Sequence, residues 1–369
     1  MGNREFVIDV GSSSIGACIA DHPAKGKPSI SSVRRIPIGT GSEESRAKIV
    51  ERTLESLSML LKEYAVLGRQ KSVRVVLASP WYAARIRFVS SKSERPAKVN
   101  SSSISKTVRE FKAKSENQPP DGVPLESIVT QVYINGYPSA LEKTVMGTTL
   151  RVHLYESYAD RSFIDAVTEK ISSVFSGAKI SFHSFPLLMF LVLRAIRDEE
   201  NFTFVDAGGE VTDVAIVHRD SLRFLGSFPK GSLYLVRNAG EQGASISDTS
   251  SRLSLYVRDE LSPAESLKFG QSFQSAVKPW AEDFQKTIEA AQTDTAVPQT
   301  TFIAADKEEL RWFNKAMESV QGVFPARPIL LAPDFFQQYI ELGESAVYDA
   351  FLSVESLYFK PGSGKELAV

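Results

Sequence analysis

The stretch Phe6-Val7-Ile8-Asp9-Val10-Gly11-Ser12-Ser13-Ser14-Ile15-Gly16 decides the fold, because a stretch of the same design follows roughly 200 residues later. The second stretch is Phe204-Val205-Asp206-Ala207-Gly208-Gly209-Glu210-Val211-Thr212-Asp213. In each, an apolar run ends in Asp, a turn of small residues follows, and a second apolar run begins. This pattern predicts a β-hairpin. Glycine lets the backbone approach a ligand, and turn N–H groups can point at an anion. Two such hairpins predict a duplicated domain that closes on a phosphate-bearing ligand.

Composition predicts a soluble globular protein of about two domains. The chain has 369 residues, of which 43% are hydrophobic and 24% are charged, and about 150 residues per domain is typical. The net charge of −1 gives no overall basic field, so nucleic acid is not an expected partner. A local basic cluster lies among serines, where we expect a solvated edge strand and loop: Arg85, Arg87, Lys92, Arg95 and Lys98.

The single cysteine and the N-terminus both indicate a cytoplasmic protein. Cys18 lies inside an apolar run, cannot form an internal disulfide and is expected to be a small buried hydrophobe. We expect no signal peptide before the first predicted strand. The longest apolar run, at 185–193, is shorter than the ~20 residues that cross a bilayer, and it predicts a buried helix. Any membrane contact is therefore expected to be peripheral.

Changes in composition divide the chain into segments. Between the hairpins, a serine-rich stretch, a Pro/Gly break and two strands around Gly136-Tyr137-Pro138 predict a small inserted α+β module. Asp306 is expected to cap a helix, with Glu309 completing a capping box. The expected segments are 1–78, a first lobe with the first hairpin; 79–182, the inserted subdomain; 183–200, a connecting helix; 201–232, the second lobe with the second hairpin; 233–298, a mostly helical subdomain; 299–344, the adenosine-loop region of the second lobe; 345–359, a C-terminal helix returning to the first lobe; and 360–369, a flexible tail.

These features together resemble the actin-like ATPase superfamily, and within it most of all the bacterial FtsA and PilM proteins. Asp9-Val10-Gly11-Ser12-Ser13-Ser14-Ile15 is similar to the first phosphate motif of that superfamily, and the stretch 206–213 is similar to the second. The inserted module lies where FtsA and PilM carry their own subdomain, the SHS2 domain. The resemblance implies an α/β fold: a duplicated, ribonuclease H-like, two-lobe actin-like architecture with a small α+β insertion.

The resemblance also implies a nucleotide site between the two turns. ATP phosphates would be held by backbone N–H groups and hydroxyls, and Mg²⁺ would be held by Asp9 and Asp206 mostly through water. No catalytic residue can be assigned, so the chain would be at most a weak ATPase. The implied cofactor-binding residues are Asp9, Gly11, Ser12, Ser13, Ser14, Asp206, Gly208, Gly209, Thr212, Ala304 and Ala305.

The chain departs from the family pattern at the same site. Ala304-Ala305 stands where the family has a Gly-Gly pair facing adenosine, and Asp306 adds a carboxylate nearby. Glu210 and Val211 replace the usual Gly and Thr of the second turn, and 230–232 keeps only part of another Gly-rich turn. Retained and lost ATP binding both stay open. Glu210 could instead contact Mg²⁺, and the two aspartates could simply cap the turns of a non-binding scaffold.

An FtsA-like scaffold in bacterial cell division is the leading functional interpretation. Its partner would be the tail of the division tubulin, with self-association as a further role of the inserted module. The sequence breaks at Lys360-Pro361-Gly362, without the basic amphipathic helix that ends FtsA, so direct membrane insertion is not expected. That favours the alternative, a PilM-like platform of type IV pilus assembly recruited to the inner membrane by a membrane protein's tail. A small-molecule kinase of the same superfamily is the second alternative.

Aromatic side chains in the second half are expected to be mostly core. Phe335 and Phe336, just after Pro333-Asp334, are the expected exposed exceptions. The others are Trp280, Phe284, Trp312 and Phe313.

Overall fold

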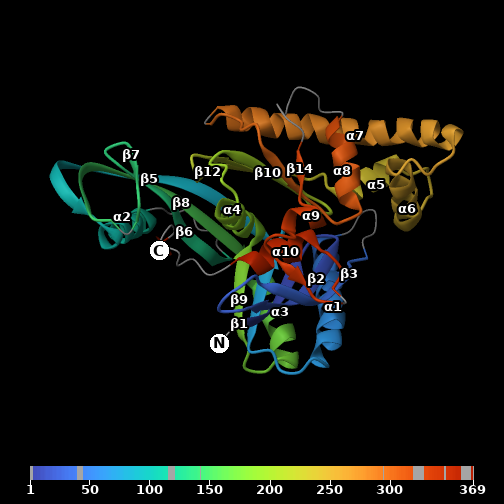
Figure 1. Ribbon diagram of the computed structural model, residues 1–369, viewed down its shortest axis with the longest axis horizontal. Coiled ribbons are helices and arrows are strands. Elements are labelled where there is room, and N and C mark those ends of the chain that lie inside the picture. Colours follow the sequence, from blue (N-terminus) through green and yellow to red (C-terminus); the bar gives the residue numbers. More distant parts are fainter. Residues whose placement is uncertain are drawn as a thin grey trace.

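The computed structural model describes residues 3–39, 45–114, 121–141, 143–293, 295–318, 328–344, 346–358 and 367–368. These form two stacked lobes with a third module projecting from one side (Figure 1). In the described part of the chain, none of the helices combines the length and the apolar character needed to cross a membrane.

Each lobe is built on a mixed sheet. The first lobe has the strand order β15-β3-β2-β1-β4-β9 and the second has β12-β11-β10-β13-β14. The strands of the first sheet are β1 (Asn3–Val10), β2 (Ser14–His22), β3 (Ser29–Pro37), β4 (Ser72–Leu77), β9 (Lys179–Ser184) and β15 (Glu341–Leu342). Those of the second are β10 (Phe202–Ala207), β11 (Thr212–His218), β12 (Ser221–Phe228), β13 (Thr301–Ala304) and β14 (Ile329–Leu330).

The two sheets repeat one topology. In the first lobe the hairpin strands β1 and β2 are antiparallel, and β4 then joins β1 in parallel. In the second, β10 and β11 are antiparallel and β13 joins β10 in parallel. Asp9 lies opposite Gly16, and Asp206 lies opposite Asp213, at equivalent ends of the two hairpins. The predicted α/β fold with duplicated halves is confirmed.

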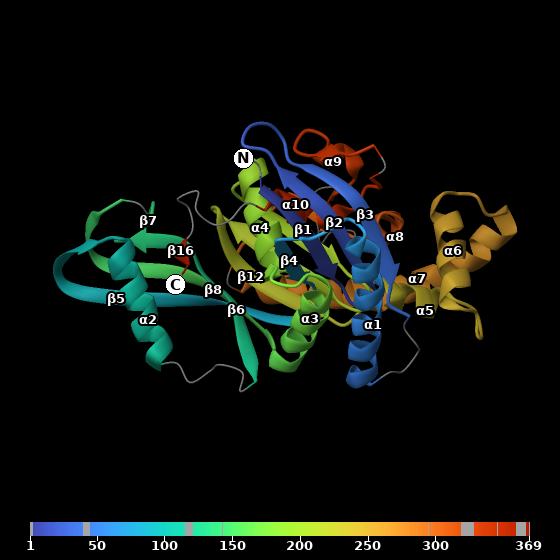
Figure 2. The same cartoon turned by 90° about the horizontal axis from the view of Figure 1, so that it is seen from below.

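Strand alternation explains how the first sheet is covered on both faces. Phe6 and Ile8 of β1 pack towards α1 (Arg46–Ala65) and α3 (Arg161–Val174), which lie side by side on one face (Figure 2). Val7 points the other way, into a core that also holds α4 (Phe185–Ile196) and α10 (Ala350–Leu357). Because successive side chains of a strand face opposite sides, a run buried on both faces is continuously apolar.

Helices also cover the outer face of the second sheet. The core there centres on Trp280 of the long helix α7 (Pro263–Gln292), which begins with a capping box between Ser262 and Glu265. Trp280, Phe284, Trp312 and Phe313 are all buried, as predicted. The other helices of this lobe are α5 (Ser232–Ala239), α6 (Ile246–Val257), α8 (Glu309–Glu318) and α9 (Pro333–Phe336).

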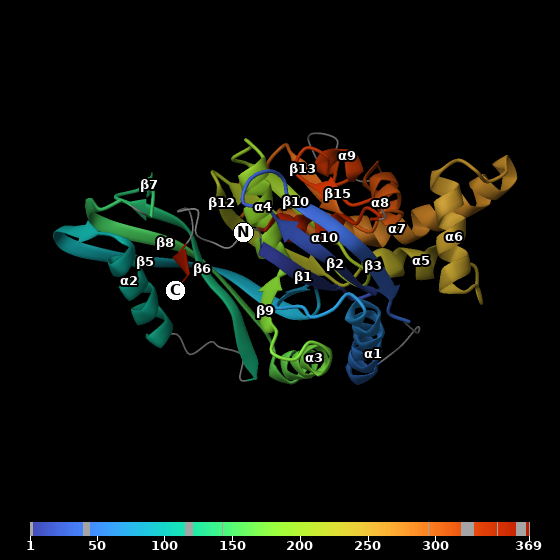
Figure 3. The same ribbon diagram turned by 60° about the horizontal axis from the view of Figure 1, so that its bottom comes forward.

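The inserted module has a sheet and a small core of its own. Its strand order is β16-β6-β8-β5, with β7 paired to β6, and α2 packs on one face (Figure 3). The serine-rich stretch is strand and helix rather than loop, since β5 runs through it to Val99 and α2 begins at Ser101. The elements are β5 (Tyr82–Val99), α2 (Ser101–Lys114), β6 (Gly122–Ile134), β7 (Tyr137–Ser139), β8 (Val145–Asp160) and β16 (Leu367–Ala368).

The structure differs from the expected segments where tertiary contacts decide. We expected 79–182 to form the insertion, but α3 packs in the core of the first lobe and β9 pairs with β4 of the first sheet. The predicted flexible tail lies largely outside the described residues, yet β16 pairs with β6. An apolar face or edge strand joins whichever sheet buries it, and the local sequence does not state which.

Three local predictions are also wrong. Helix α8 begins at Glu309 rather than after Asp306, because the Asp306 carboxylate faces Arg35 instead of the helix N-terminus. Helix α10 begins at Ala350, capped by the Asp349 side chain on Leu352 N. Phe336 is buried rather than exposed.

Candidate functional site

The turns of the two hairpins face each other across the interface between the lobes. They line a small cavity, here called the inner cleft, with a volume of about 20 Å³. Asp9 and Asp206 therefore share one cavity. The lining residues are Asp9, Gly11, Ser12, Ser13, Ser14, Arg35, Ala78, Ser79, Asp206, Ala207, Gly208, Gly209, Val211, Asp306, Glu309 and Phe351.

The two turns touch each other directly. The Glu210 N–H donates to Ser12 Oγ across the lobe interface at 2.9 Å. A Cβ atom on Gly209 would lie 2.3 Å from the Cβ of Ser13, and one on Gly231 would lie 2.2 Å from the carbonyl oxygen of Gly208. Because these contacts are so close, both positions require glycine. The lobes are closed at the point where phosphates were expected.

Several N–H groups expected to cradle phosphates have partners within the protein. Gly11 N donates to Ser14 O at 3.0 Å, and Gly208 N donates to Val211 O at 3.1 Å. The first turn of α5, which follows the partial Gly-rich turn, donates its Ser232 and Leu233 N–H groups to the carbonyl oxygens of Gly208 and Gly209, each at 2.9 Å. The N-terminus of a helix can bind an anion only through free N–H groups. Here two of those groups are used to hold the second hairpin.

Arg35 of β3 supplies a cation at the edge of the inner cleft. Its guanidinium lies 2.9 Å from Asp9, 2.7 Å from Asp349 and 3.4 Å from Asp306, and it also donates to Ser14 Oγ at 2.9 Å. Burial opposes the charge, but the three carboxylates raise the pKa of Arg35 well above its usual value. Arg35 thus joins the first hairpin, the adenosine-loop region and the start of α10.

Gly16 makes room for that arginine. A Cβ atom there would lie 2.6 Å from Arg35 Nη2, so a larger residue at position 16 would displace the guanidinium.

The two predicted magnesium ligands are buried carboxyls in different surroundings. Burial raises the pKa of Asp9 to about 6, against the opposing effect of Arg35. Burial, with the nearby charges of Asp213 and Asp9, raises the pKa of Asp206 well above its usual value. One oxygen of each, Oδ1, is buried without a hydrogen-bond partner. Within the described ranges, no group of three or more His, Cys, Asp or Glu side chains is arranged to hold a metal ion.

The remaining predicted residues lie beside the inner cleft and do not line it. The Thr212 hydroxyl donates to Lys230 O at 2.7 Å and accepts from Trp280 Nε1 at 3.2 Å. Ala304 and Ala305 are completely buried, in cores on opposite sides of the second sheet. The Glu210 carboxylate forms a two-pronged ion pair with Arg237 instead of facing a phosphate or a metal ion.

A wider cavity of about 660 Å³ adjoins the inner cleft and shares Arg35, Asp306 and Glu309 with it. Ligand sites of this volume are common, so a nucleoside would fit there. A triphosphate would not fit further in, because about 20 Å³ holds roughly one water molecule. The carboxylates around Arg35 would also repel phosphate. The residues of the closed cleft therefore do not fit Mg²⁺ and ATP, and binding requires the hairpins to separate.

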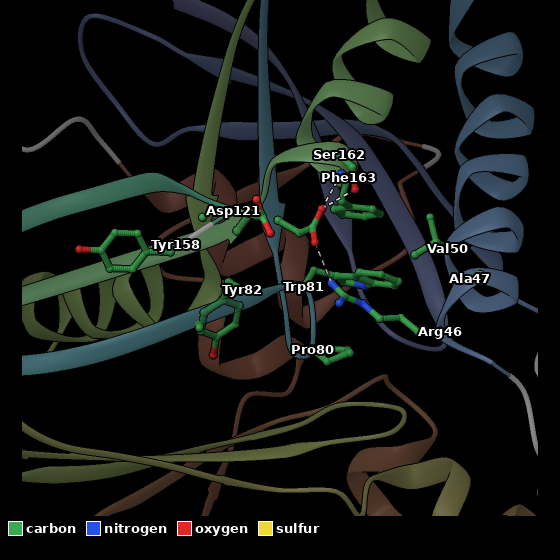
Figure 4. Close-up of a pocket in the computed structure, with 14 residues that line it drawn as sticks. Arg46, Ala47, Val50, Pro80, Trp81, Tyr82, Asp121, Tyr158, Ser162 and Phe163 are labelled. Carbon is green, nitrogen blue, oxygen red and sulfur yellow. Dashed lines mark hydrogen bonds and ion pairs between the residues drawn. The ribbon is translucent and has the colours of Figure 1, made fainter. Parts of the chain in front are cut away.

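A second large cavity lies on the other side of the first hairpin, between the first lobe and the inserted module (Figure 4). We call it the junction pocket; its volume is about 670 Å³. Trp81 forms its floor, stacked on Phe163 with ring centroids 4.4 Å apart and planes at 8°. Arg46 and Asp160 form an ion pair of 3.2 Å at its rim. The lining residues are Arg46, Ala47, Val50, Pro80, Trp81, Tyr82, Ala83, Asp121, Gly122, Tyr158, Ala159, Asp160, Ser162 and Phe163.

Two side chains connect the junction pocket to the hairpins. Trp81 Nε1 donates to the carbonyl oxygen of Gly11 in the first turn at 2.7 Å. The Tyr82 hydroxyl donates to Asp213 Oδ2 of the second hairpin at 2.8 Å. The pocket and the inner cleft are thus two sides of one hydrogen-bonded wall. Asp213 thus fixes a contact between the second hairpin and the inserted module.

Comparison with solved structures identifies the fold. A PilM–PilN type IV pilus biogenesis complex superposes with a TM-score of 0.65 at 13% identity, covering 96% of this chain and 97% of that one. The chain has the actin-like fold. A second similar structure is an actin-like ATPase fold protein of unknown function from Bacteroides thetaiotaomicron, with a TM-score of 0.40 and 8% identity over 96% of this chain and 95% of that one. A third is the ethanolamine utilization protein EutJ from Carboxydothermus hydrogenoformans, with a TM-score of 0.45 and 10% identity over 89% of this chain and 84% of that one.

Comparison of the sequence with family models and with curated proteins finds no match.

The sequence did not reveal Arg35, Asp349 or the junction pocket. Arg35 is one of two adjacent arginines in an ordinary strand, and Asp349 stands far along the chain from its partner. Trp81 directly follows the buried strand β4 and Pro80, a position that could have served as a weak signal of a structural or binding role. No local pattern indicates that these residues meet others from distant segments.

Proposed function

We propose that this actin-fold chain is a protein-binding scaffold of the PilM kind, which takes up the short tail of a membrane-anchored pilus-assembly protein. The likeness to a PilM–PilN complex, over almost the full length of both chains, supports this choice. It also favours the PilM-like role over the FtsA-like role in cell division. By the same proposal, the chain reaches the inner membrane through this partner.

The junction pocket is the observation that carries the proposal. Its volume of about 670 Å³ suits a few side chains of an extended peptide. Trp81, Phe163 and Val50 offer an apolar floor, while Arg46 and Asp160 place charges at the rim. An aliphatic or aromatic residue of the tail would be buried against Trp81, and polar groups of the peptide would meet the rim. Central apolar anchors with a polar rim are the usual composition of protein-binding sites.

The closed inner cleft supports a scaffold rather than an enzyme. Its Arg35 cation already lies against Asp9, Asp306 and Asp349, and α5 uses its first N–H groups on the second hairpin. In this proposal the cleft is a structural joint between the lobes, and ATP with Mg²⁺ is not required for tail binding. A small-molecule kinase would need an open cleft and a catalytic carboxylate, and no described residue stands out for that role.

Isothermal titration of the full chain tests both parts of the proposal. The titrants are a synthetic tail of a pilus membrane protein from the same organism, the corresponding tail of the division tubulin, and ATP with Mg²⁺. We expect heat from the pilus tail alone. Binding of only the tubulin tail would overturn the pilus role, and strong binding of ATP would overturn the closed joint.

A space-filling substitution locates the tail site. Ala47 is an exposed residue of α1 at the mouth of the pocket, so Ala47→Trp should weaken tail binding about tenfold or more without loss of stability. Met59→Trp is the matched control, because Met59 is 57% exposed on the same helix and does not line the pocket. Equal affinity for Ala47→Trp and wild type would exclude the junction pocket as the site.

A further inference from the structure

A fourth cavity lies where the inserted module meets β12 of the second lobe. Its volume is about 470 Å³, and we call it the cationic cavity. Three strands of the module and one strand of the second lobe form it. Its lining residues are Ser90, Ser91, Lys92, Tyr133, Gly136, Thr149, Leu150, Arg151, His153 and Arg223.

The charges in this cavity are all of one sign. Lys92, Arg151 and Arg223 contribute cations, and the described residues of the lining include no carboxylate. Strand pairing sets Tyr133 opposite Arg151, and Lys92 opposite Thr149, so the cations occupy neighbouring rows of one sheet face. Among the described residues, none of the three cations has a carboxylate within 4.0 Å, the limit for an ion pair.

On the opposite face of β5, the arginines have a carboxylate partner. Arg85 and Arg87 lie at odd positions of β5 and form ion pairs with Glu156, at 3.0 and 3.1 Å. Arg87 also lies over the ring of Phe111 on α2. Side chains alternate along a strand, so the even-numbered Lys92 points to the other face, away from Glu156. On the covered face Glu156 neutralises both arginines, whereas on the cavity face the described residues provide no carboxylate partner for the cations.

Arg223 is the best-positioned of the three cations. Its Nη2 donates to the Tyr133 hydroxyl at 2.9 Å, and its Nη1 lies 3.4 Å from His153 Nε2. Its Nε is buried and has no hydrogen-bond partner. Burial lowers the pKa of His153 to about 3, and the charges of Arg223 and Arg151 add to the shift. The cations Lys92, Arg151 and Arg223 themselves give the cavity its positive potential.

An apolar side chain borders the cations. Phe88 is 50% exposed, and its ring forms a T-shaped contact with the His153 ring at a centroid distance of 4.7 Å. Burying an exposed phenylalanine against a partner is favourable. The cavity therefore offers unpaired cations beside one aromatic contact. A ligand that uses both carries carboxylates next to an apolar side chain.

We propose that the cationic cavity binds an acidic peptide segment of a partner protein, with carboxylates on Lys92, Arg151 and Arg223 and an apolar side chain on Phe88. A free phosphate suits the cavity less well, because phosphate sites usually present converging backbone N–H groups. Here the walls are mainly strands, and the N–H groups of the central strand β8 pair with β5 and β6 on either side. This site is separate from the junction pocket, so the proposal stands whether or not that pocket binds a pilus-protein tail.

Fluorescence anisotropy on the full chain tests the site. The probe is a labelled ten-residue peptide of glutamates with one central phenylalanine, and the double variant is Lys92→Glu with Arg151→Glu. Both residues are exposed, so folding should be unaffected. We expect wild type to bind, and the double variant to lose about tenfold or more in affinity. Added salt should weaken the binding of wild type, because salt screens exposed charges.

The control has the same change in charge at another place on the strand. Arg95→Glu with Lys98→Glu alters two exposed cations of β5 that do not line the cavity, and it should bind like wild type. An equal loss of affinity in both double variants would mean that only the overall charge of the protein matters, and it would overturn the proposal. It would also be overturned if millimolar inorganic phosphate displaced the peptide, or if phosphatidylserine vesicles bound while the peptide did not.

Discussion

The inner cleft and the junction pocket lie on two sides of one wall, and they differ in what fills them. The cleft carries the residues that the motifs mark, yet Arg35 and the touching turns leave about 20 Å³. The pocket carries no motif, yet it offers about 670 Å³ over an aromatic floor. A polar site whose groups satisfy one another needs no ligand, whereas an uncovered apolar floor gains free energy when a partner covers it.

Removal of Arg35 should have the largest effect on stability, because it removes the cation that keeps the inner cleft filled. Arg35→Ala leaves Asp9 and Asp349 buried without their cation, which should lower the free energy of unfolding by about 4 kcal/mol. Urea unfolding monitored by circular dichroism measures it. The matched control is Arg34→Ala, whose exposed ion pair with Glu63 should contribute less than about 0.5 kcal/mol. Equal, small effects of the two variants would mean that the cleft does not depend on its internal cation.

A methyl group at the hairpin contact should have an intermediate effect. Gly209→Ala would place a Cβ atom 2.3 Å from that of Ser13, so the lobes must separate, at a cost of about 2 kcal/mol. Thermal unfolding is the measurement. Gly39→Ala is the control, since the nearest atom there is 3.9 Å away. If Gly209→Ala were as stable as wild type, the cleft would be open in solution, and nucleotide binding would have to be reconsidered.

Loss of the hydrogen bond that connects the junction pocket to the inner cleft should have the smallest effect on stability. Trp81→Phe keeps an aromatic ring over Phe163 but loses the bond from Nε1 to Gly11 O, worth about 1 kcal/mol. The comparison is Trp312→Phe, because Trp312 is also buried and its Nε1 has no hydrogen-bond partner. A greater loss of stability for Trp81→Phe than for Trp312→Phe would support the link. Equal losses of stability would mean that the change in ring size explains both effects.

Contacts between distant segments explain where the sequence analysis stopped. The hairpins at Asp9 and Asp206 were predictable, because an apolar run, an aspartate and a turn of small residues form a local pattern. The start of α8 was not, because Asp306 could cap a helix or face an arginine, and only the position of Arg35 decides between them. The place of α3 was missed for a similar reason, because its apolar stripe could pack on either sheet.

The sequence by itself determined the duplicated two-lobe fold, since periodicity and turn chemistry act over a few residues and occur twice in this chain. Only the tertiary structure decided that the turns of the two hairpins touch, that Arg35 provides the charge between them, and that Trp81 lies beneath an open pocket. Each of these depends on the packing of segments far apart in the chain. Burial and electrostatic interactions are set by three-dimensional neighbours, and spacing along the sequence does not record them.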